Sequence, residues 1–219
     1  TVVNGNANRR SGIDLTFSMP KSASLLAQLG GDKRILDAQL AAVKATMAYL
    51  EKHYAQARDR SRNANGEGVV TGNLVYALFQ HDTSRALDPQ NHTHAVIAAM
   101  TQDKDGNWKA LWNGEIWKNN TTIGQFYHAA FRAQLQKLGY ETEAAGKHGS
   151  FEIKGVPAEV IKAFSTRANE IEAKIAETGA TSLATKKQIT LYTRDPKLVP
   201  EDRGTLVEGW QQRAAELGF

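Results

Sequence analysis

Three histidines that lie close together in the sequence are the side chains best suited to chemistry. They are His81, His92 and His94, half of the six histidines in the chain, within a stretch of fourteen residues. His92 and His94 precede an apolar run at residues 95–100, which predicts a β-strand. Side chains at i and i+2 of a strand share a face, so both imidazoles would converge on one place. Three neutral nitrogens there would hold one divalent metal ion with open coordination positions.

The segments around the histidines must bring His81 to the other two. His81 follows a second apolar run at residues 73–79, and a connection at residues 82–91 leads to His92. This connection contains Asp88-Pro89, which is a turn signal. Adjacent antiparallel strands would therefore place His81 beside the pair. The pattern alone leaves the chemistry open, because it also suits a zinc hydratase or a cupin-type oxygenase, and ordinary structural histidines are a further alternative.

The rest of the chain predicts an α+β fold in which helices flank a central antiparallel sheet. Residues 11–19 alternate between apolar and polar side chains, as a half-buried strand does. We expect Trp108, Trp112 and Trp117 to lie in the core. Residues 1–156 form the expected metal-binding part and residues 157–219 a helical appendage. Further strands are expected at 68–80, 92–102 and 108–112, a hairpin at 140–153, and helices at 32–57, 115–138, 157–177, 182–193 and 205–217.

Composition limits the possible classes of function. The chain has 219 residues and no cysteine, which excludes disulfides and thiolate metal sites. The net charge of +4 permits a polyanionic partner without requiring one. No apolar run approaches the length of a membrane span. The chain begins with Thr1 rather than methionine, which we interpret as a fragment or a processed piece.

Four motifs together resemble hallmarks of the TrwC/TraI-type conjugative relaxases. These proteins form the MobF family of the HUH endonucleases, which nick and rejoin single-stranded DNA. The resemblance continues more weakly to the end of the chain. The four motifs are SGIDLTFSMPKS at residues 11–22, TGNLV at 71–75, HDTSR at 81–85 and PQNHTHAV at 89–96.

The resemblance implies a fold and a set of site residues. The fold is a ferredoxin-like sheet, the HUH relaxase fold, with a mobile helical C-terminal part that folds over DNA. His81, His92 and His94 would bind one divalent ion: Mg, Mn or another transition metal. Asp14 would lie near them as a catalytic, orienting carboxylate. Its place on the polar face of its strand agrees, because metal-bound imidazoles usually donate their other N–H to an acceptor.

The resemblance also implies the reaction. A tyrosine attacks DNA at a plasmid origin of transfer, leaving a 5′-phosphotyrosyl link and a free 3′-hydroxyl, which starts conjugative transfer. That tyrosine lies near the N-terminus of such relaxases. None of the thirteen residues before Asp14 is a tyrosine, so the nucleophile is expected outside this chain.

Basic residues are the candidates for DNA contacts, because single strands are held by cationic grooves. Arg85 and Lys21 belong to two of the motifs, and we expect them to contact phosphates. An ion pair of Arg85 with Asp82 or Asp88 is an equally good interpretation. Lys186, Lys187 and Arg194 belong to the helical appendage and are further candidates; their alternative role is a solvated surface.

The implied partners are a single-stranded origin-of-transfer hairpin and the accessory and coupling proteins of conjugation. A monomer in the bacterial cytoplasm, without membrane insertion, is expected. Two other functions stay open on the sequence. One is a non-catalytic, sequence-specific module that binds single-stranded DNA, and the other is a three-histidine metalloenzyme that acts on small molecules.

Overall fold

The structure is a computed structural model that describes residues 2–3, 6–7, 10–58, 68–192 and 202–219. The chain divides into two compact units, each assembled from separate segments. The sheet unit comprises Thr1–Ser18, Asp37–His81 and His92–Phe151, and the helical unit comprises Met19–Leu36, Asp82–Asn91 and Glu152–Phe219. The predicted α+β class, with antiparallel sheets and helices, is confirmed.

Three strands form the central sheet in the order β3-β7-β6. They are β3 (Gly12–Ser18), β7 (Pro89–Ala98) and β6 (Tyr76–Thr83). β3 and β7 are antiparallel, with Ser18 opposite His92 at one end and Gly12 opposite Ala98 at the other. Buried and exposed residues alternate along β3, as predicted. The adjacency of β6 and β7, on which the metal-site prediction depended, is also present.

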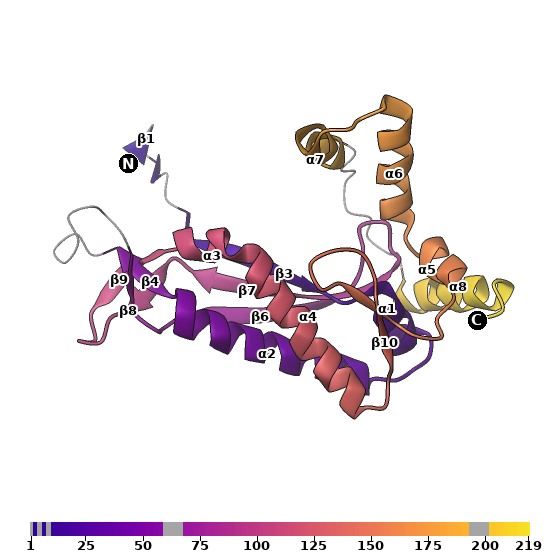
Figure 1. Cartoon of the computed structure of the whole chain (residues 1–219), viewed down its shortest axis with the longest axis horizontal. Helices are drawn as coiled ribbons and strands as arrows, with labels where there is room; N and C mark the ends of the chain where they lie inside the picture. Colours follow the sequence, from indigo (N-terminus) through magenta and orange to yellow (C-terminus); the bar gives the residue numbers. More distant parts are fainter. Residues whose placement is uncertain (1, 4–5, 8–9, 59–67, 193–201) are drawn as a thin grey trace. The chain divides into compact units, whose positions relative to one another are not determined.

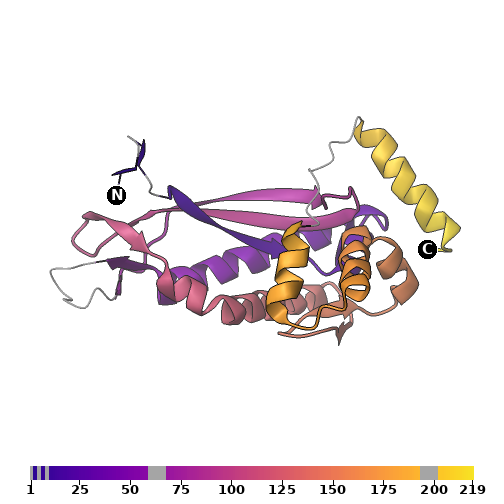
Figure 2. The same cartoon turned by 90° about the horizontal axis from the view of Figure 1, so that it is seen from above.

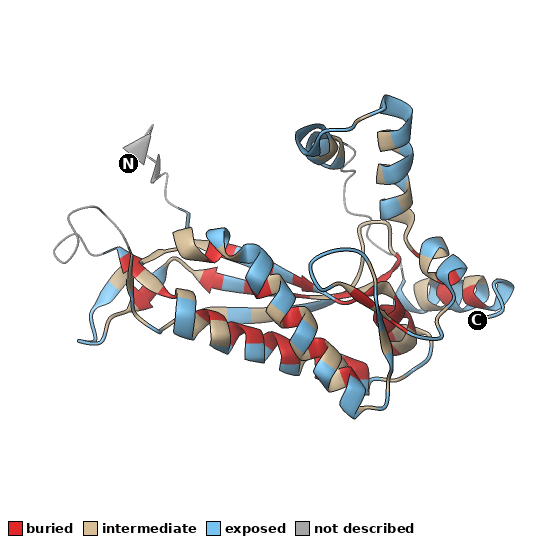
Figure 3. Cartoon of the chain, in the orientation of Figure 1, coloured by how far each residue is buried: buried red, intermediate tan, exposed pale blue. Residues whose placement is uncertain are grey.

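One face of this sheet is covered by helices α2 (Arg34–Tyr54) and α4 (Asn120–Lys137), as Figures 1 and 2 show from two directions. The rings of Phe17 on β3 and Tyr127 on α4 lie 5.2 Å apart at their centroids. Each helix turns an apolar stripe inward, which Figure 3 shows in red along α2. The side chains that fill this layer include Leu15, Ala95, Ile97, Val43, Met47, Leu50, Ile123, Phe131 and Leu135.

The second sheet corrects two strand predictions. Residues 68–80 and 92–102 do not form single strands. The first splits because Gly72 adopts a φ of +67°, and the second splits at Ala99. The order of the second sheet is β5-β4-β9-β8. Its strands are β4 (Gln56–Arg58), β5 (Gly68–Val70), β8 (Met100–Gln102) and β9 (Trp108–Trp112).

Two long helix predictions are corrected in the same way. The expected helix 115–138 consists of α3 (Gly114–Lys118) and α4, and the side-chain amide of Asn119 at the break donates to the carbonyl of Glu115 at 2.8 Å. The expected helix 157–177 consists of α5 (Ala158–Ala163) and α6 (Thr166–Thr178). At that break the Ser165 hydroxyl donates to the carbonyl of Ile161 at 2.6 Å. Such side-chain bonds compete with helix continuation.

The placement of Trp108 and Trp117 in the core was also wrong, while Trp112 is half-buried. Trp108 is 55% exposed and Trp117 47% exposed. Trp108 starts β9 directly after the turn of the β8–β9 hairpin, and turns lie at the surface. On α3 it is Ile116, the residue before Trp117, that is fully buried.

The helical unit has a small core of its own. Its buried members are Leu25, Val160, Phe164, Trp210 and Ala214. Leu25 belongs to α1 (Lys21–Gln28), a helix that was not predicted and that begins directly after Pro20. The remaining helices of this unit are α7 (Leu183–Tyr192) and α8 (Arg203–Glu216).

The remaining elements are short. The strand pairs are β1 (Val2–Val3) with β2 (Asn6–Ala7), and β10 (Thr142–Ala144) with β11 (Phe151–Ile153). Among the described residues, no helix combines the length and the apolar character that crossing a membrane requires.

Candidate metal centre and DNA contacts

The structure brings the three predicted histidines together in the sheet unit. One ring nitrogen from each of His81, His92 and His94 can be chosen so that all three atoms lie within 4.8 Å of one another. The ring centroids are 5.3 Å apart for His81 and His92, 5.0 Å for His81 and His94, and 5.1 Å for His92 and His94. Because these separations are nearly equal, the three rings surround one point in a nearly symmetrical way.

Strand alternation in β7 gives His92 and His94 their shared direction. Thr93, between them, is fully buried, and its hydroxyl donates to the side-chain oxygen of Gln39 on α2 at 3.0 Å. The Gln39 amide nitrogen in turn donates to the carbonyl of Phe17 on β3 at 3.0 Å. A buried and satisfied polar network of this kind specifies one arrangement of its members, because breaking any bond leaves a polar group unpaired. Gln39 therefore fixes the two strands that carry Asp14, His92 and His94.

Asp14 and Thr16 reach His94 from the neighbouring strand. Asp14 Oδ2 lies 2.8 Å from His94 Nδ1, and Thr16 Oγ1 lies 3.2 Å from the same nitrogen. The ionised carboxylate can only accept, so Nδ1 carries a proton and Nε2 presents its lone pair. The prediction that Asp14 lies beside the histidines holds in this geometry. Thr16 was placed on the same polar face but was not singled out as a site residue.

The donor set fits one divalent ion. Three imidazoles on a rigid sheet leave coordination positions open, as catalytic centres do, and imidazole suits Zn, Cu, Fe or Ni better than Mg. His81 is exposed and the other two are half-buried, so a ligand can approach from solvent. Phe79 and Val96 stand two residues from His81 and His94 and are 52% and 42% exposed. Apolar surface thus adjoins the histidines.

The candidate DNA-binding residues have different surroundings. Lys21 is half-buried in the helical unit, where its ammonium donates to the carbonyl of Pro89 at 2.8 Å. Burial lowers the pKa of Lys21 to about 8, and the nearby carboxylates of Asp88 and Glu152 offset part of that effect. Arg85 is half-buried in the turn between β6 and β7.

The other basic candidates belong to α7 or follow it. Lys186 is half-buried and Lys187 exposed, both on α7. Arg194 lies outside the described residues.

The acids near Arg85 interact with arginines of α8. Asp82 pairs with Arg203, and Asp88 lies 3.5 Å from Arg213. Asp88 is buried and also accepts two hydrogen bonds from Thr166, at 2.8 and 3.1 Å. From the sequence alone, Asp88 was interpreted only as a turn residue and a possible partner of Arg85. Its distant partners leave no local signal in the sequence.

Known proteins resemble this chain in sequence and in fold. The chain is 42% identical to the multifunctional conjugation protein TraI of Escherichia coli over 225 residues, which covers 98% of this chain and 12% of the length of TraI. A copper-bound structure of the conjugative relaxase TrwC with oriT DNA superposes with a TM-score of 0.86 at 42% identity, covering 96% of this chain and 72% of that one. For TrwC complexed with a 27-mer DNA comprising the recognition hairpin and the cleavage site, the TM-score is 0.85 at 42% identity, covering 95% and 74%.

A family model described as TrwC relaxase matches residues 2–217. Nearly the whole chain is covered, and the histidine cluster and Asp14 lie inside the match. The chain therefore belongs to the TrwC relaxase family.

Proposed function

We propose that this chain is the part of a metal-dependent conjugative relaxase that binds and processes DNA. Its substrate is a single strand at a plasmid origin of transfer, which it nicks at one site and on one strand. The reaction is a transesterification. A tyrosine oxygen bonds to phosphorus, and the bond from phosphorus to the 3′-oxygen breaks. The phenol loses its proton, and the 3′-oxygen gains one to become a free hydroxyl. One phosphodiester replaces another, so the step is reversible and needs no ATP.

The observation that carries this proposal is the histidine cluster with Asp14 bonded to His94. It lies in a chain that is 42% identical to TraI over nearly all of its length. His81, His92 and His94 would hold one divalent ion. When bound, such an ion neutralises negative charge on the scissile phosphate. The protein's own contribution is a rigid set of neutral nitrogens, with His94 held in one tautomer by Asp14.

The attacking hydroxyl in this proposal belongs to a tyrosine that is not among the six of this sequence. Tyr127 is buried among the helices, and burial raises the pKa of its phenol. Burial also raises the pKa of the half-buried Tyr76. Tyr76 and His81 are an odd number of residues apart on β6, so their side chains point to opposite faces of the strand. Asp14 is the carboxylate placed to accept a proton near the centre.

The helical part, residues 157–219, is proposed to clamp the DNA, and residues 1–156 to hold the metal. Lys21, Arg85, Lys186, Lys187 and Arg194 are the proposed phosphate contacts. Aromatic and apolar surface beside the histidines, which Phe79 and Val96 provide, suits a splayed nucleobase. We further propose that the protein acts as a monomer in the bacterial cytoplasm, with the accessory and coupling proteins of conjugation as partners.

The test is fluorescence-anisotropy binding of the chain to labelled single strands carrying candidate origin-of-transfer hairpins, over a series of salt concentrations. We expect selective binding to one strand, and an affinity that falls linearly with salt on a logarithmic scale. A scrambled strand of the same composition is the control. Nicking of the selected strand is then measured with the intact protein that carries this chain and with its His92→Ala variant.

Two outcomes would contradict the proposal. Equal affinity for the hairpin strand and the scrambled strand would remove the site-specific part. Full nicking by His92→Ala in the intact protein would remove the histidine cluster from the reaction. Selective binding combined with no metal-dependent nicking would instead favour a binding module.

A further inference from the structure

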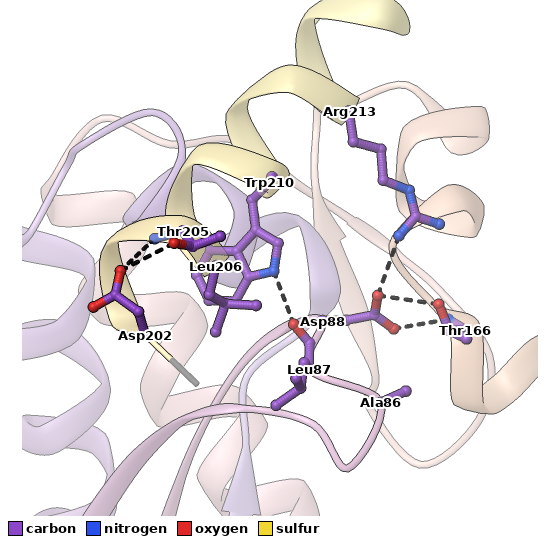
Figure 4. Close-up of a pocket in the computed structure, with 10 residues that line it drawn as sticks. Ala86, Leu87, Asp88, Thr166, Asp202, Thr205, Leu206, Trp210 and Arg213 are labelled. Carbon is purple, nitrogen blue, oxygen red and sulfur yellow. Dashed lines mark hydrogen bonds and ion pairs between the residues drawn. The ribbon is translucent and has the colours of Figure 1, made fainter. Parts of the chain in front are cut away.

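Asp88 joins three elements of the helical unit at one buried point. It is 3% exposed. One carboxylate oxygen accepts from the backbone N–H of Thr166 at 2.8 Å, and the other accepts from the Thr166 hydroxyl at 3.1 Å and lies 3.5 Å from Arg213. Figure 4 shows the carboxylate between these two residues. Thr166 is the first residue of α6 and Arg213 lies on α8, so Asp88 fixes the start of one helix and contacts a second.

The turn that carries Asp88 has several hydrogen bonds of its own. Ser84 and Asp88 exchange two hydrogen bonds, from Ser84 N to Asp88 O at 2.9 Å and from Asp88 N to Ser84 Oγ at 3.1 Å. The indole N–H of Trp210 donates to the carbonyl of Leu87 at 2.8 Å (Figure 4). The turn links β6 to β7, the two strands that bear the histidines. Asp88 is therefore held from its own segment and is a fixed point for α6.

Helix α7 depends on α6 for its position. No residue of α7 is buried, and it carries Lys186 and Lys187 without any acidic residue. Arg167, next to Thr166 on α6, donates to the carbonyl of Thr190 on α7 at 3.0 Å. An element with so little buried surface has low local stability and takes its place from its few anchors.

We propose that Asp88 is a positioning residue for DNA binding: it fixes the start of α6 and, through α6, the place from which Lys186 and Lys187 of α7 contact DNA phosphates. The inference rests on the proposed function, since it assumes that these lysines bind DNA. Burial is the main cause that raises the pKa of Asp88, while Lys21, Thr166 and Arg213 favour its charged form. We interpret these contacts with α6 and α8 as the reason that a carboxylate occupies this buried position.

The experiment compares DNA affinity and its salt dependence in four proteins: the unmodified chain, Asp88→Ala, the double variant Lys186→Gln/Lys187→Gln, and the combination of all three changes. The lysine variant is expected to reduce the salt slope by about 2, one for each lost phosphate contact. Asp88→Ala is expected to reduce it by a similar amount. The combination is expected to lose little more than either, because both act through the same contacts.

The chain offers a matched control in Asp202. One of its carboxylate oxygens accepts from the backbone N–H of Thr205 at 2.8 Å and from the Thr205 hydroxyl at 3.1 Å, the same two kinds of donor that Asp88 has in Thr166, but at the start of α8. Asp202→Ala is expected to keep the salt slope. Metal affinity, measured without DNA, is expected to be the same in every variant. If Asp88→Ala does not fold, Thr166→Val tests the same anchor from the other side.

An unchanged salt slope in Asp88→Ala, additive losses in the combination, or equal losses in Asp202→Ala would each overturn the inference. If the lysine variant itself binds like the unmodified chain, the lysines have no role in DNA binding, and the inference is overturned together with that part of the proposed function. Loss in the lysine variant with none in Asp88→Ala overturns the inference alone.

Discussion

The carboxylate of Asp14 contacts Nδ1 of His94, one of the three clustered histidines. The contact is 2.8 Å long and joins residues on two neighbouring strands, with Thr16 reaching the same ring nitrogen. In the pairing of β3 with β7, Thr16 is directly opposite His94 and Asp14 is opposite Val96. Asp14 and Thr16 are two residues apart on β3, so both side chains lie on the face of the strand next to His94. The orientation of His94 is thus set by the pairing of β3 with β7.

Replacing Asp14 tests whether this contact tunes the metal site. Asp14→Ala is expected to weaken binding of a divalent ion by about 10–100-fold, because ligand orientation and basicity are lost. The free energy of unfolding is expected to change by less than about 0.5 kcal/mol, since the side chain is exposed. Competition with a chromogenic chelator measures the affinity. Ser18→Ala, on the same exposed face of β3, is the control, and equal affinities in both variants would refute the role.

The histidines themselves can be tested against a histidine of the same chain. His92→Ala is expected to abolish stoichiometric metal binding, because two imidazoles alone make a poor site. His148→Asn is the control: His148 is exposed, and its φ of +59° is one that asparagine tolerates. Metal content after dialysis gives the result. Binding is also expected to weaken in acid, where protons compete for imidazole nitrogens. Retained stoichiometry in His92→Ala would contradict the assignment.

The buried pair of Gln39 and Thr93 behind the histidines is expected to stabilise the fold. Gln39→Leu leaves the Thr93 hydroxyl without its acceptor, and we expect a loss of about 1–3 kcal/mol in the free energy of unfolding. Adding Thr93→Val is expected to restore part of this loss, since both partners are then apolar. Urea denaturation measures the four proteins of the cycle. Strictly additive effects would mean that the two side chains do not interact.

Lys21 predicts a pH dependence of stability. Its pKa of about 8 lies below the ordinary value of 10.5, so the folded chain binds fewer protons than the unfolded chain between these values. The free energy of unfolding should therefore rise as the pH increases from about 8 to 10.5, by about 1–3 kcal/mol for this half-buried group. Lys21→Met is expected to remove that rise. Lys33→Met is the control, because exposed Lys33 also donates to a backbone carbonyl, that of Ala27 at 3.1 Å. A rise that survives in Lys21→Met would exclude Lys21 as its source.

Periodicity and spacing predicted the parts of the fold that depend on local pattern. The alternation of β3, the shared face of His92 and His94, and the adjacency of β6 and β7 all follow from a two-residue repeat and a short connection. The position of Gly139 after α4, with a φ of +91°, also agreed with the expected helix end.

The features that were missed depend on contacts between distant residues. Helix α1 packs Leu25 against Phe164 and Trp210, far away in the chain. The breaks at Asn119 and Ser165 come from single side-chain bonds to a preceding carbonyl, which hydrophobic periodicity does not register. The roles of Gln39 and Asp88 likewise require partners on other elements. Sequence therefore predicted the histidine centre more fully than the network that holds it.

The alternation of β7 limits how this family can change by insertion and deletion. Gaining or losing one residue between Asn91 and Ala95 would exchange the two faces of the strand on one side of the change. Thr93 would then point to solvent, or a histidine would enter the layer beneath the sheet, where the side-chain oxygen of Gln39 accepts a hydrogen bond from the Thr93 hydroxyl. Length changes in this strand are tolerable only in steps of two. Descendants of this sequence are expected to vary in the loops and in α7, while the strand from Asn91 to Ala95 keeps a constant length.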